Sequence, residues 1–296
     1  MSIEITPLHP LFAGEVAGVD LRRPLTADEV RAIEAGMDRH AVLVFRDQAI
    51  DDEQQVAFTE NFGAIEIAAG NQLKSQYESR RISIKLADIS NLDAKSNLLA
   101  RDDKRRMFNL GNQLWHSDSS FRAKPAKYSL LSARVVPPSG GNTEFADMRA
   151  AYDALDEATK AEIEDLVCEH SLLYSRGALG FTDFTDDERQ MFRPVRQRLV
   201  RVHPVTGRKS LFLSSHIGRI IGWPVPEGMA FIRDLVEHAT QRQFVHAHVW
   251  RVGDLVMWDN RQTMHRARRY AETTYVRDLR RTTVAGEVFT AEQVAA

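Results

Sequence analysis

Short apolar runs, bounded by turn residues and gathered in the second half of the chain, are the feature that most constrains the fold. We predict strands over these runs, at 42–45, 82–87, 113–119, 128–136, 199–203, 210–214, 244–249, 255–258 and 279–284. Apolar residues at helical spacing predict helices over about 26–40, 51–63, 147–155, 158–167 and 226–240. Many short strands with few helices predict a mainly β fold with α insertions, a sandwich or jelly roll whose core is flanked by helices.

Length and composition favour one elaborated domain over residues 1–296. Hydrophobic residues make up 43% of the chain and charged residues 27%, so the chain can bury a sizeable core. Two segments with weak patterns, about 64–110 and 170–195, are predicted to be mobile loops next to a site. The pattern shows no nucleotide-binding glycine motif and no serine-hydrolase elbow, which argues against those common classes.

Charge and cysteine content limit the partners and the compartment. The 39 Lys and Arg residues nearly balance the 41 Asp and Glu residues, which argues against a nucleic-acid-coating or membrane-surface protein. Cys168 is the only cysteine, so the chain forms no internal disulfide, zinc ribbon or iron–sulfur cluster. The N-terminal residues lack the pattern of a secretory signal. We therefore expect a cytoplasmic protein with no nucleic-acid or membrane partner.

A histidine and an aspartate two residues apart, His116 and Asp118, are the first candidates for chemistry. On a strand, residues i and i+2 share one face about 6.5 Å apart, so both side chains can reach one metal ion. His265, which follows a buried strand, is the best candidate for a third ligand. Two imidazoles and one carboxylate form the facial triad of non-haem Fe(II) oxygenases. The alternative is a chance pair, because ten histidines supply many candidate partners.

Two arginines after His265 in the sequence favour a functional site over a chance arrangement. Arg277 and Arg281 lie four residues apart on a predicted strand, hence on one face and about 13 Å apart at their backbones. Planar guanidinium groups bind carboxylates bidentately, so each arginine could hold one carboxylate, one from a co-substrate and one from a substrate. The alternative is that both side chains are exposed to solvent and bind nothing, as we expect for Arg280 between them.

These segments resemble a known enzyme family. Residues 112–121, 135–145, 147–155 and 253–261, together with 277–286, are similar to the 2-oxoglutarate-dependent dioxygenases typified by taurine dioxygenase and 2,4-dichlorophenoxyacetate dioxygenase, over about residues 5–287. The similarity is greatest to the phenoxyalkanoate branch. The resemblance implies a jelly-roll fold, Fe(II) as the metal, 2-oxoglutarate and O2 as co-substrates, and a homo-oligomer.

The resemblance also assigns roles by position. It implies that His116, Asp118 and His265 bind Fe(II) and are the catalytic residues, and that Thr143 and Arg277 hold the distal carboxylate of 2-oxoglutarate. Arg281 would bind the carboxylate of the primary substrate. Asn112 and His216 match positions that line the substrate pocket, although each is as readily a structural hydrogen-bonder.

One departure from the family pattern affects the arginines. The segment between His265 and Arg277 carries one additional residue within 270–276. A turn would absorb it, whereas a shift of strand register would turn Arg277 and Arg281 to the wrong side and bring in Arg280. Lys74 and Lys95 fall where related phenoxyacetate enzymes have basic pocket residues, but surface lysines are the commoner case.

The function that the resemblance implies is hydroxylation of the carbon next to the ether oxygen of an aryloxyacetate such as 2,4-dichlorophenoxyacetate. The products would be a phenol, glyoxylate, succinate and CO2. Alternatives with the same chemistry are taurine, another alkylsulfonate or sulfate, or a phenoxypropionate. A more distant alternative is a jelly-roll protein that binds metal without turnover, and a metal-dependent hydrolase would need a general base that the sequence does not offer.

Overall fold

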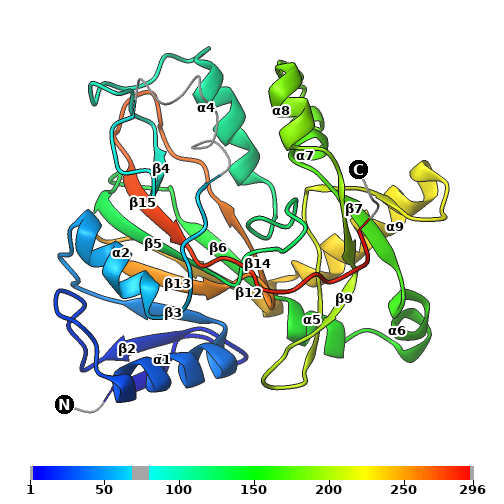
Figure 1. Cartoon of the computed structure of the whole chain (residues 1–296), viewed down its shortest axis with the longest axis horizontal. Coiled ribbons are helices and arrows are strands. Elements are labelled where there is room, and N and C mark those ends of the chain that lie inside the picture. Colours follow the sequence, from blue (N-terminus) through cyan, green and yellow to red (C-terminus); the bar gives the residue numbers. More distant parts are fainter. Residues whose placement is uncertain (1–2, 69–79, 294–296) are drawn as a thin grey trace.

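A seven-stranded sheet forms the larger part of the core in the computed structural model, which describes residues 3–68 and 80–293 (Figure 1). Its strands lie in the order β1-β2-β3-β13-β5-β15-β4, so segments far apart in sequence are neighbours. Their bounds are β1 Glu4–Pro7, β2 Gly14–Ala17, β3 Val42–Phe45, β4 Ala87–Ser90, β5 Tyr128–Val135, β13 Leu255–Asp259 and β15 Asp278–Thr283. Only β2 and β3 pair in parallel, among the described strand pairs of this sheet.

A second sheet, in the order β12-β6-β14, faces the first and completes the jelly roll. Its strands are β6 Thr143–Asp147, β12 Val245–His248 and β14 Thr263–Ala267. Two smaller sheets pair β7 Val167–His170 with β8 Val195–Arg198 and β11 Ile217–Ile220, and β9 Val200–Val202 with β10 Lys209–Leu211. The fold is thus mainly β, as the short apolar runs predict.

Helices flank this core. They are α1 Ala27–His40, α2 Asp52–Glu60, α4 Lys104–Asn109, α5 Met148–Asp153, α6 Glu157–Ile163, α7 Leu172–Gly177, α8 Asp186–Met191 and α9 Val225–Ala239, with 3-10 helices η2 Leu110–Gln113 and η3 Arg242–Phe244. Helices α1 and α2 cover the outer face of the large sheet, whereas α4, α7 and α8 gather at one end of the molecule, at the top of Figure 1.

Strand β3 shows how the two layers use the sequence. All four of its residues are buried, because each face of the sheet is covered. Val42 and Val44 point towards the second sheet. They pack with Phe145 of that sheet and with Trp258 of the neighbouring strand β13. Leu43 and Phe45 point the other way and pack against α1 and α2. Alternation of side chains along the strand therefore supplies two cores from one apolar run.

Several predicted elements differ from the structure. The predicted strand at 113–119 is wrong: η2 covers its start, His116 forms a single bridge with His265, and a turn follows. The predicted strand at 82–87 begins later, as β4, and the helix predicted to 167 ends at Ile163 before β7. The first predicted loop segment contains β4 and α4, and the second contains α7 and α8. Their mobility stays a prediction.

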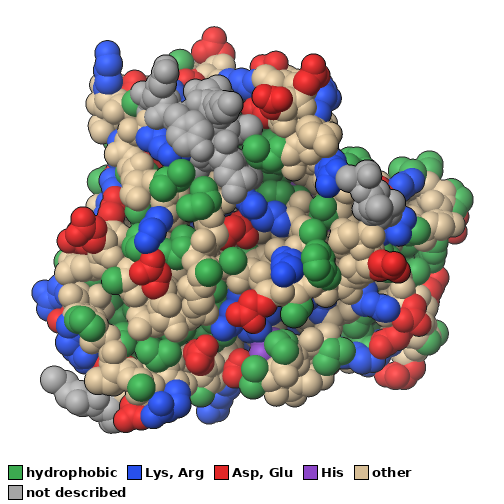
Figure 2. Space-filling view, viewed as in Figure 1, with side chains coloured by type: hydrophobic (Ala, Val, Ile, Leu, Met, Phe, Trp, Pro, Cys, Tyr) green, Lys and Arg blue, Asp and Glu red, His purple; other side chains and the backbone are tan. Residues whose placement is uncertain are grey.

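The surface agrees with the charge balance. Lys and Arg side chains are interspersed with Asp and Glu side chains over the face seen in Figure 2. None of the helices in the described ranges is long and apolar enough to cross a membrane.

Candidate metal centre and substrate site

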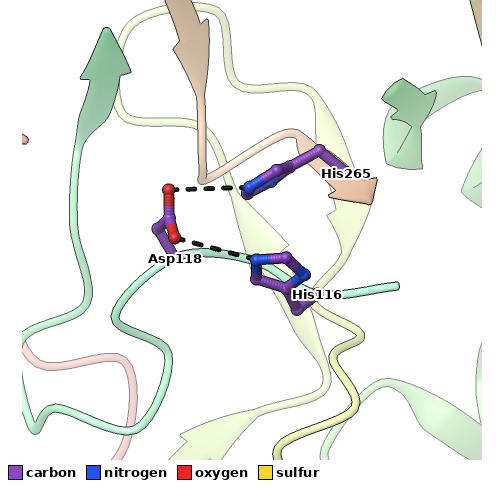
Figure 3. A group of neighbouring side chains, drawn as sticks. All are labelled: His116, Asp118 and His265. Atoms are coloured by element: carbon purple, nitrogen blue, oxygen red, sulfur yellow. Dashed lines mark ion pairs between the residues drawn. The ribbon is translucent and has the colours of Figure 1, made fainter. Parts of the chain in front are cut away.

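His116, Asp118 and His265 meet in a buried cluster whose candidate ligand atoms all lie within 4.8 Å of one another. The Asp118 carboxylate lies on one side of the two rings and faces both, 3.9 Å from Nε2 of His116 and 3.7 Å from Nε2 of His265 (Figure 3). Both rings turn their Nε2 atoms towards the carboxylate. Two nitrogen donors and one oxygen donor therefore converge on one point. His265 lies on β14, whereas His116 and Asp118 lie on no regular strand.

Backbone pairing explains how these residues meet. The N–H of His116 donates to the carbonyl of His265 at 3.0 Å, and the reverse bond is 2.8 Å. Ser119 then adopts a left-handed conformation, with φ of 54°, which turns the chain directly after Asp118. A non-glycine residue in this region is under strain, and such strain is concentrated at functional sites.

A ring of hydrogen bonds holds the Asp118 carboxylate. The backbone N–H of Asp118 donates to Oδ1 of Asn260 at 3.1 Å, and Nδ2 of Asn260 donates to the Ser129 hydroxyl at 2.9 Å. The Ser129 hydroxyl donates to Oδ2 of Asp118 at 2.7 Å, which closes the ring. These bonds fix both the backbone and the carboxylate before any ligand binds.

The charge states of the three side chains suit metal binding. Burial lowers the pKa of His116 and that of His265, so both imidazoles are neutral at pH 7. Burial alone would raise the pKa of Asp118, but the charge of Arg281, together with the hydrogen bond from Ser129, lowers it to about 2. The Nδ1 of His116 lies 2.8 Å from the Leu114 carbonyl, which makes Nδ1 the protonated nitrogen and leaves the Nε2 lone pair free.

Gly141 connects Thr143 with Arg277, because it lies two residues before Thr143 and contacts the Arg277 guanidinium. Thr143 begins β6, two residues from Phe145, which pairs with His265; its side chain therefore faces the same side as the His265 ring. The guanidinium of Arg277 is buried, and its Nε donates to the Gly141 carbonyl at 3.3 Å. Gly141 has a φ of 69°, and a Cβ there would lie 3.3 Å from the Arg277 Nε. Glycine therefore permits both the turn and the close approach.

The register of β15 places Arg280 and Arg281 on opposite faces. Arg281 directs Nη1 to the Asp118 carboxylate at 2.5 Å. Arg280 pairs with Asp52 on α2 at 2.5 Å. The segment with the additional residue forms a turn at Ala271 to Tyr275, and Arg277 follows it, directly before β15. The pairing of β15 with β5 is irregular between Asp278 and Leu279 and regular from Leu279 to Thr283.

The remaining predicted residues differ in their positions. His216 is buried just before β11, with its ring 5.9 Å from the His116 ring and its Nδ1 2.9 Å from the Ser175 hydroxyl. Asn112 is half-buried in η2. Lys95 is exposed in a turn, where its backbone N–H donates to Asp93. Lys74 lies outside the described residues.

The structure adds residues that no motif marks. Ser129 and Asn260 hold Asp118, as described above. Glu66, whose pKa burial raises, accepts a hydrogen bond from the Ser119 hydroxyl at 2.6 Å and pairs with Arg122. Arg176 is buried near the same cluster. Sequence position alone does not reveal these contacts, because their partners are tens of residues away.

A jelly roll that carries two imidazoles and one carboxylate on one buried face defines a class, the facial-triad oxygenases. Comparison with known proteins gives the family. A profile of the family "Taurine catabolism dioxygenase TauD, TfdA family" matches residues 4–283. The chain belongs to this family of dioxygenases.

Individual relatives cover nearly the whole chain. An alpha-ketoglutarate-dependent 2,4-dichlorophenoxyacetate dioxygenase of Cupriavidus pinatubonensis is 51% identical over 96% of this chain and 98% of its own. The (S)-phenoxypropionate/alpha-ketoglutarate-dioxygenase of Delftia acidovorans is 38% identical over 90% of this chain and 89% of its own. The crystal structure of AAD-2 in complex with Mn(II) and N-oxalylglycine is 62% identical, with a TM-score of 0.95 over 98% of this chain and 100% of that one.

Proposed function

We propose that this chain is an Fe(II)- and 2-oxoglutarate-dependent dioxygenase that hydroxylates the carbon next to the ether oxygen of an aryloxyacetate such as 2,4-dichlorophenoxyacetate. The observation that carries the proposal is the convergence of His116, Asp118 and His265 on one point, where Arg281 pairs with the Asp118 carboxylate. The names of the relatives support the substrate class, since the 51% identical relative is named for 2,4-dichlorophenoxyacetate.

The donor set fits Fe(II). Two neutral imidazoles and an ionised carboxylate on one face leave three positions of a six-coordinate ion for other ligands. The ring of hydrogen bonds through Asn260 and Ser129 holds the carboxylate in place, as second-shell partners of metal ligands do. The Mn(II) and N-oxalylglycine named for the AAD-2 structure support a metal and a 2-oxoglutarate-like dicarboxylate at this site.

The two co-substrate residues would hold the distal carboxylate of 2-oxoglutarate. Arg277 offers a buried guanidinium with no carboxylate partner among the described residues. Thr143 lies two residues after Gly141, whose carbonyl accepts the hydrogen bond from Arg277. Trp250 donates its Nε1–H to the Thr143 hydroxyl oxygen at 3.0 Å, which leaves the hydroxyl hydrogen for a ligand. These groups bind and orient the co-substrate.

Arg281 would bind the carboxylate of the aryloxyacetate and hold its methylene carbon beside the metal. When bound, the iron and 2-oxoglutarate together supply the oxidation, in which 2-oxoglutarate and O2 become succinate and CO2 and one oxygen atom enters the substrate C–H bond. The hydroxylated product is a hemiacetal. The bond between its ether oxygen and the hydroxylated carbon breaks, the hydroxyl proton is transferred to the ether oxygen, and a phenol and glyoxylate are released. The position of the carboxylate therefore determines which carbon reacts.

Two experiments test the proposal. The first supplies the wild-type enzyme with Fe(II), 2-oxoglutarate, O2 and a panel of acids, and measures succinate and phenol separately. Phenol in equal amount to succinate supports an aryloxyacetate substrate. Coupled succinate with taurine, an alkyl sulfate or a phenoxypropionate, but not with an aryloxyacetate, would keep the chemistry and refute the substrate.

The second experiment tests the metal ligands. Asp118→Ala should abolish Fe(II) binding, measured by anaerobic titration calorimetry, as well as turnover. Asp88→Ala on β4 removes a carboxylate that pairs with Arg81 and serves as the control. Unimpaired Fe(II) binding by Asp118→Ala would contradict the ligand assignment.

We also propose that the enzyme is one domain, forms a homo-oligomer and works in the cytoplasm. The one-domain organisation is supported by the large sheet, whose strands come from residues 4 to 283. The family resemblance supports the oligomer, and the single cysteine supports a reducing compartment. Light scattering coupled to gel filtration tests the oligomer, since a mass of 33.5 kDa would contradict it.

A further inference from the structure

Arg176, on α7, is a buried cation without an ion-pair partner among the residues that the structure describes. Its side chain is 4% exposed, and its Nε is buried without a hydrogen-bond partner in the described part of the chain. Its Nη1 donates only to the neighbouring Ser175 hydroxyl, at 3.1 Å. Burying an unpaired charge costs several kcal/mol, so such groups are retained mainly where a ligand supplies the opposite charge.

The surroundings place Arg176 beside the metal cluster. Its charge acts on Asp118, His116 and Arg281, which shows that these groups are close in space. The Ser175 hydroxyl that it contacts is also 2.9 Å from Nδ1 of His216. Two guanidinium groups, those of Arg176 and Arg281, thus lie near the Asp118 carboxylate, and Arg281 pairs with it. The nearby Glu66 carboxylate pairs with Arg122, so one positive charge remains unpaired among these described residues before any metal or ligand is counted.

The packing of Arg176 directs it to this position. Its guanidinium stacks over the Phe108 ring of α4, 4.4 Å from the ring centre. It also lies against Gly111, where a Cβ would come within 2.5 Å of the guanidinium carbon. Gly111 precedes Asn112 in η2, so Arg176 supports the segment that leads to the first metal ligand. The contact joins α4 and α7, which lie at the same end of the molecule in Figure 1.

Aromatic side chains continue from this cation to the metal cluster. Each ring contacts the next edge-on, with centres 5.1 to 6.3 Å apart, and the last one contacts the His116 ring. The members, in order of contact, are Phe108, Phe181, Phe184, Phe192, Phe121 and His216. An unpaired guanidinium bordered by aromatic rings complements a ligand that joins an anionic group to an aryl ring.

We propose that Arg176 is a specificity-determining residue that binds the anionic group of the substrate together with Arg281, with the row of aromatic side chains packing on the aryl ring. This inference rests on the proposed function and deepens it. Two cations hold one carboxylate from two sides, so they fix its direction as well as attract it. The substrate class selected is therefore aryl acids with a single negative charge.

Anaerobic calorimetry of the enzyme loaded with Fe(II) and 2-oxoglutarate tests this role without turnover. The ligands are 2,4-dichlorophenoxyacetate and its uncharged carboxamide. Arg176→Met should weaken binding of the acid by about ten- to hundredfold, as expected for a lost hydrogen bond to a charged group, while binding of the carboxamide changes less than about threefold. Arg176→Lys, which keeps the charge but loses the planar fork, should fall between.

Arg201→Met is the matched control. Arg201 is half-buried, has a nitrogen without a hydrogen-bond partner among the described residues and stacks over Phe212 at 4.6 Å, but its charge interacts with Asp259 and Arg261 instead of the metal cluster. This variant should bind the acid as the wild type does. Equal weakening of acid and carboxamide by Arg176→Met, or no weakening of either, would overturn the inference, and if that variant does not fold, wild-type affinity in Arg176→Lys would do so.

The results distinguish a failure of the proposed function from a failure of the role of Arg176. A wild-type enzyme that neither binds nor oxidises any aryloxyacetate refutes the proposed function and this inference with it. A wild-type enzyme that oxidises the acid while Arg176→Met binds it normally overturns only the role of Arg176.

Discussion

Replacing Arg277 by methionine tests the co-substrate site. We expect a large rise in the KM for 2-oxoglutarate and little change in the free energy of unfolding. The guanidinium is buried, and burial lowers the pKa of Arg277 to about 10. Its side-chain hydrogen bond to a neutral acceptor is the one from Nε to the Gly141 carbonyl. No carboxylate of the described chain forms an ion pair with it. The variant therefore breaks no ion pair within the protein.

The expected magnitude follows from these contacts. A guanidinium that binds a carboxylate through two N–H groups makes two hydrogen bonds to a charged group, each contributing at least about 1.5 kcal/mol. Their loss, about 3 kcal/mol, corresponds to a roughly 150-fold rise in the KM for 2-oxoglutarate. The free energy of unfolding should change by less than about 1 kcal/mol, because the lost hydrogen bond to Gly141 is offset by relief of an unpaired buried charge.

Succinate formation at saturating Fe(II) and aryloxyacetate gives the KM for 2-oxoglutarate, and denaturant unfolding gives the stability. Arg280→Met is the matched control, because Arg280 lies on β15, three residues after Arg277, but pairs with Asp52. It should leave the KM for 2-oxoglutarate unchanged. A change of less than about threefold for Arg277→Met would refute the reasoning, and a large rise for Arg280→Met would show that the register of β15 is wrong.

Three further predictions concern charged residues. Arg281→Met should raise the KM for the aryloxyacetate about ten- to hundredfold and leave that for 2-oxoglutarate unchanged, since it removes a charged hydrogen bond to the primary substrate; steady-state kinetics with each substrate varied would contradict this if the two effects were reversed. Arg149→Met should destabilise the fold by about 3–5 kcal/mol in denaturant unfolding, because it leaves the buried Asp147 carboxylate without its bidentate partner; a loss below about 1 kcal/mol would show that the pair contributes little. Burial alone would raise the pKa of Asp259, but Arg261 holds it below the usual range. The ionised Asp259 therefore stabilises the folded state at neutral pH, and this contribution is lost as the pH falls below about 4. Asp259→Asn should therefore flatten the acid side of a plot of stability against pH, and an unchanged acid slope would contradict this.

The elements with strong local signals could be predicted from the sequence. Thr26 and Glu29 form the capping box that begins α1, and the apolar run at β3 has the observed bounds. Strands β6 and β14 were not predicted, because their sequences mix polar and apolar residues. Their pairing with each other stabilises them, and a pairing between segments this far apart leaves no local pattern.

The candidate site divides in the same way. The motif at His116 and Asp118 marks the metal ligands, but the predicted strand is replaced by one bridge and a turn. His116 and Asp118, two residues apart, still direct their side chains to the same point, because the chain turns at the left-handed residue Ser119, after both of them. Arg176 carried no signal, since one arginine in a six-residue helix is not distinguished from a surface residue until its burial is known.

The most direct test of the central claim is anaerobic loading of the purified enzyme with Fe(II), 2-oxoglutarate and 2,4-dichlorophenoxyacetate, followed by exposure to air. Succinate and the phenol are then measured in the same sample. The proposed function predicts one phenol released for each succinate formed, and neither product when Fe(II) is omitted. Succinate without phenol would contradict the substrate, and no consumption of 2-oxoglutarate with any acid of the panel would contradict the assignment as a dioxygenase.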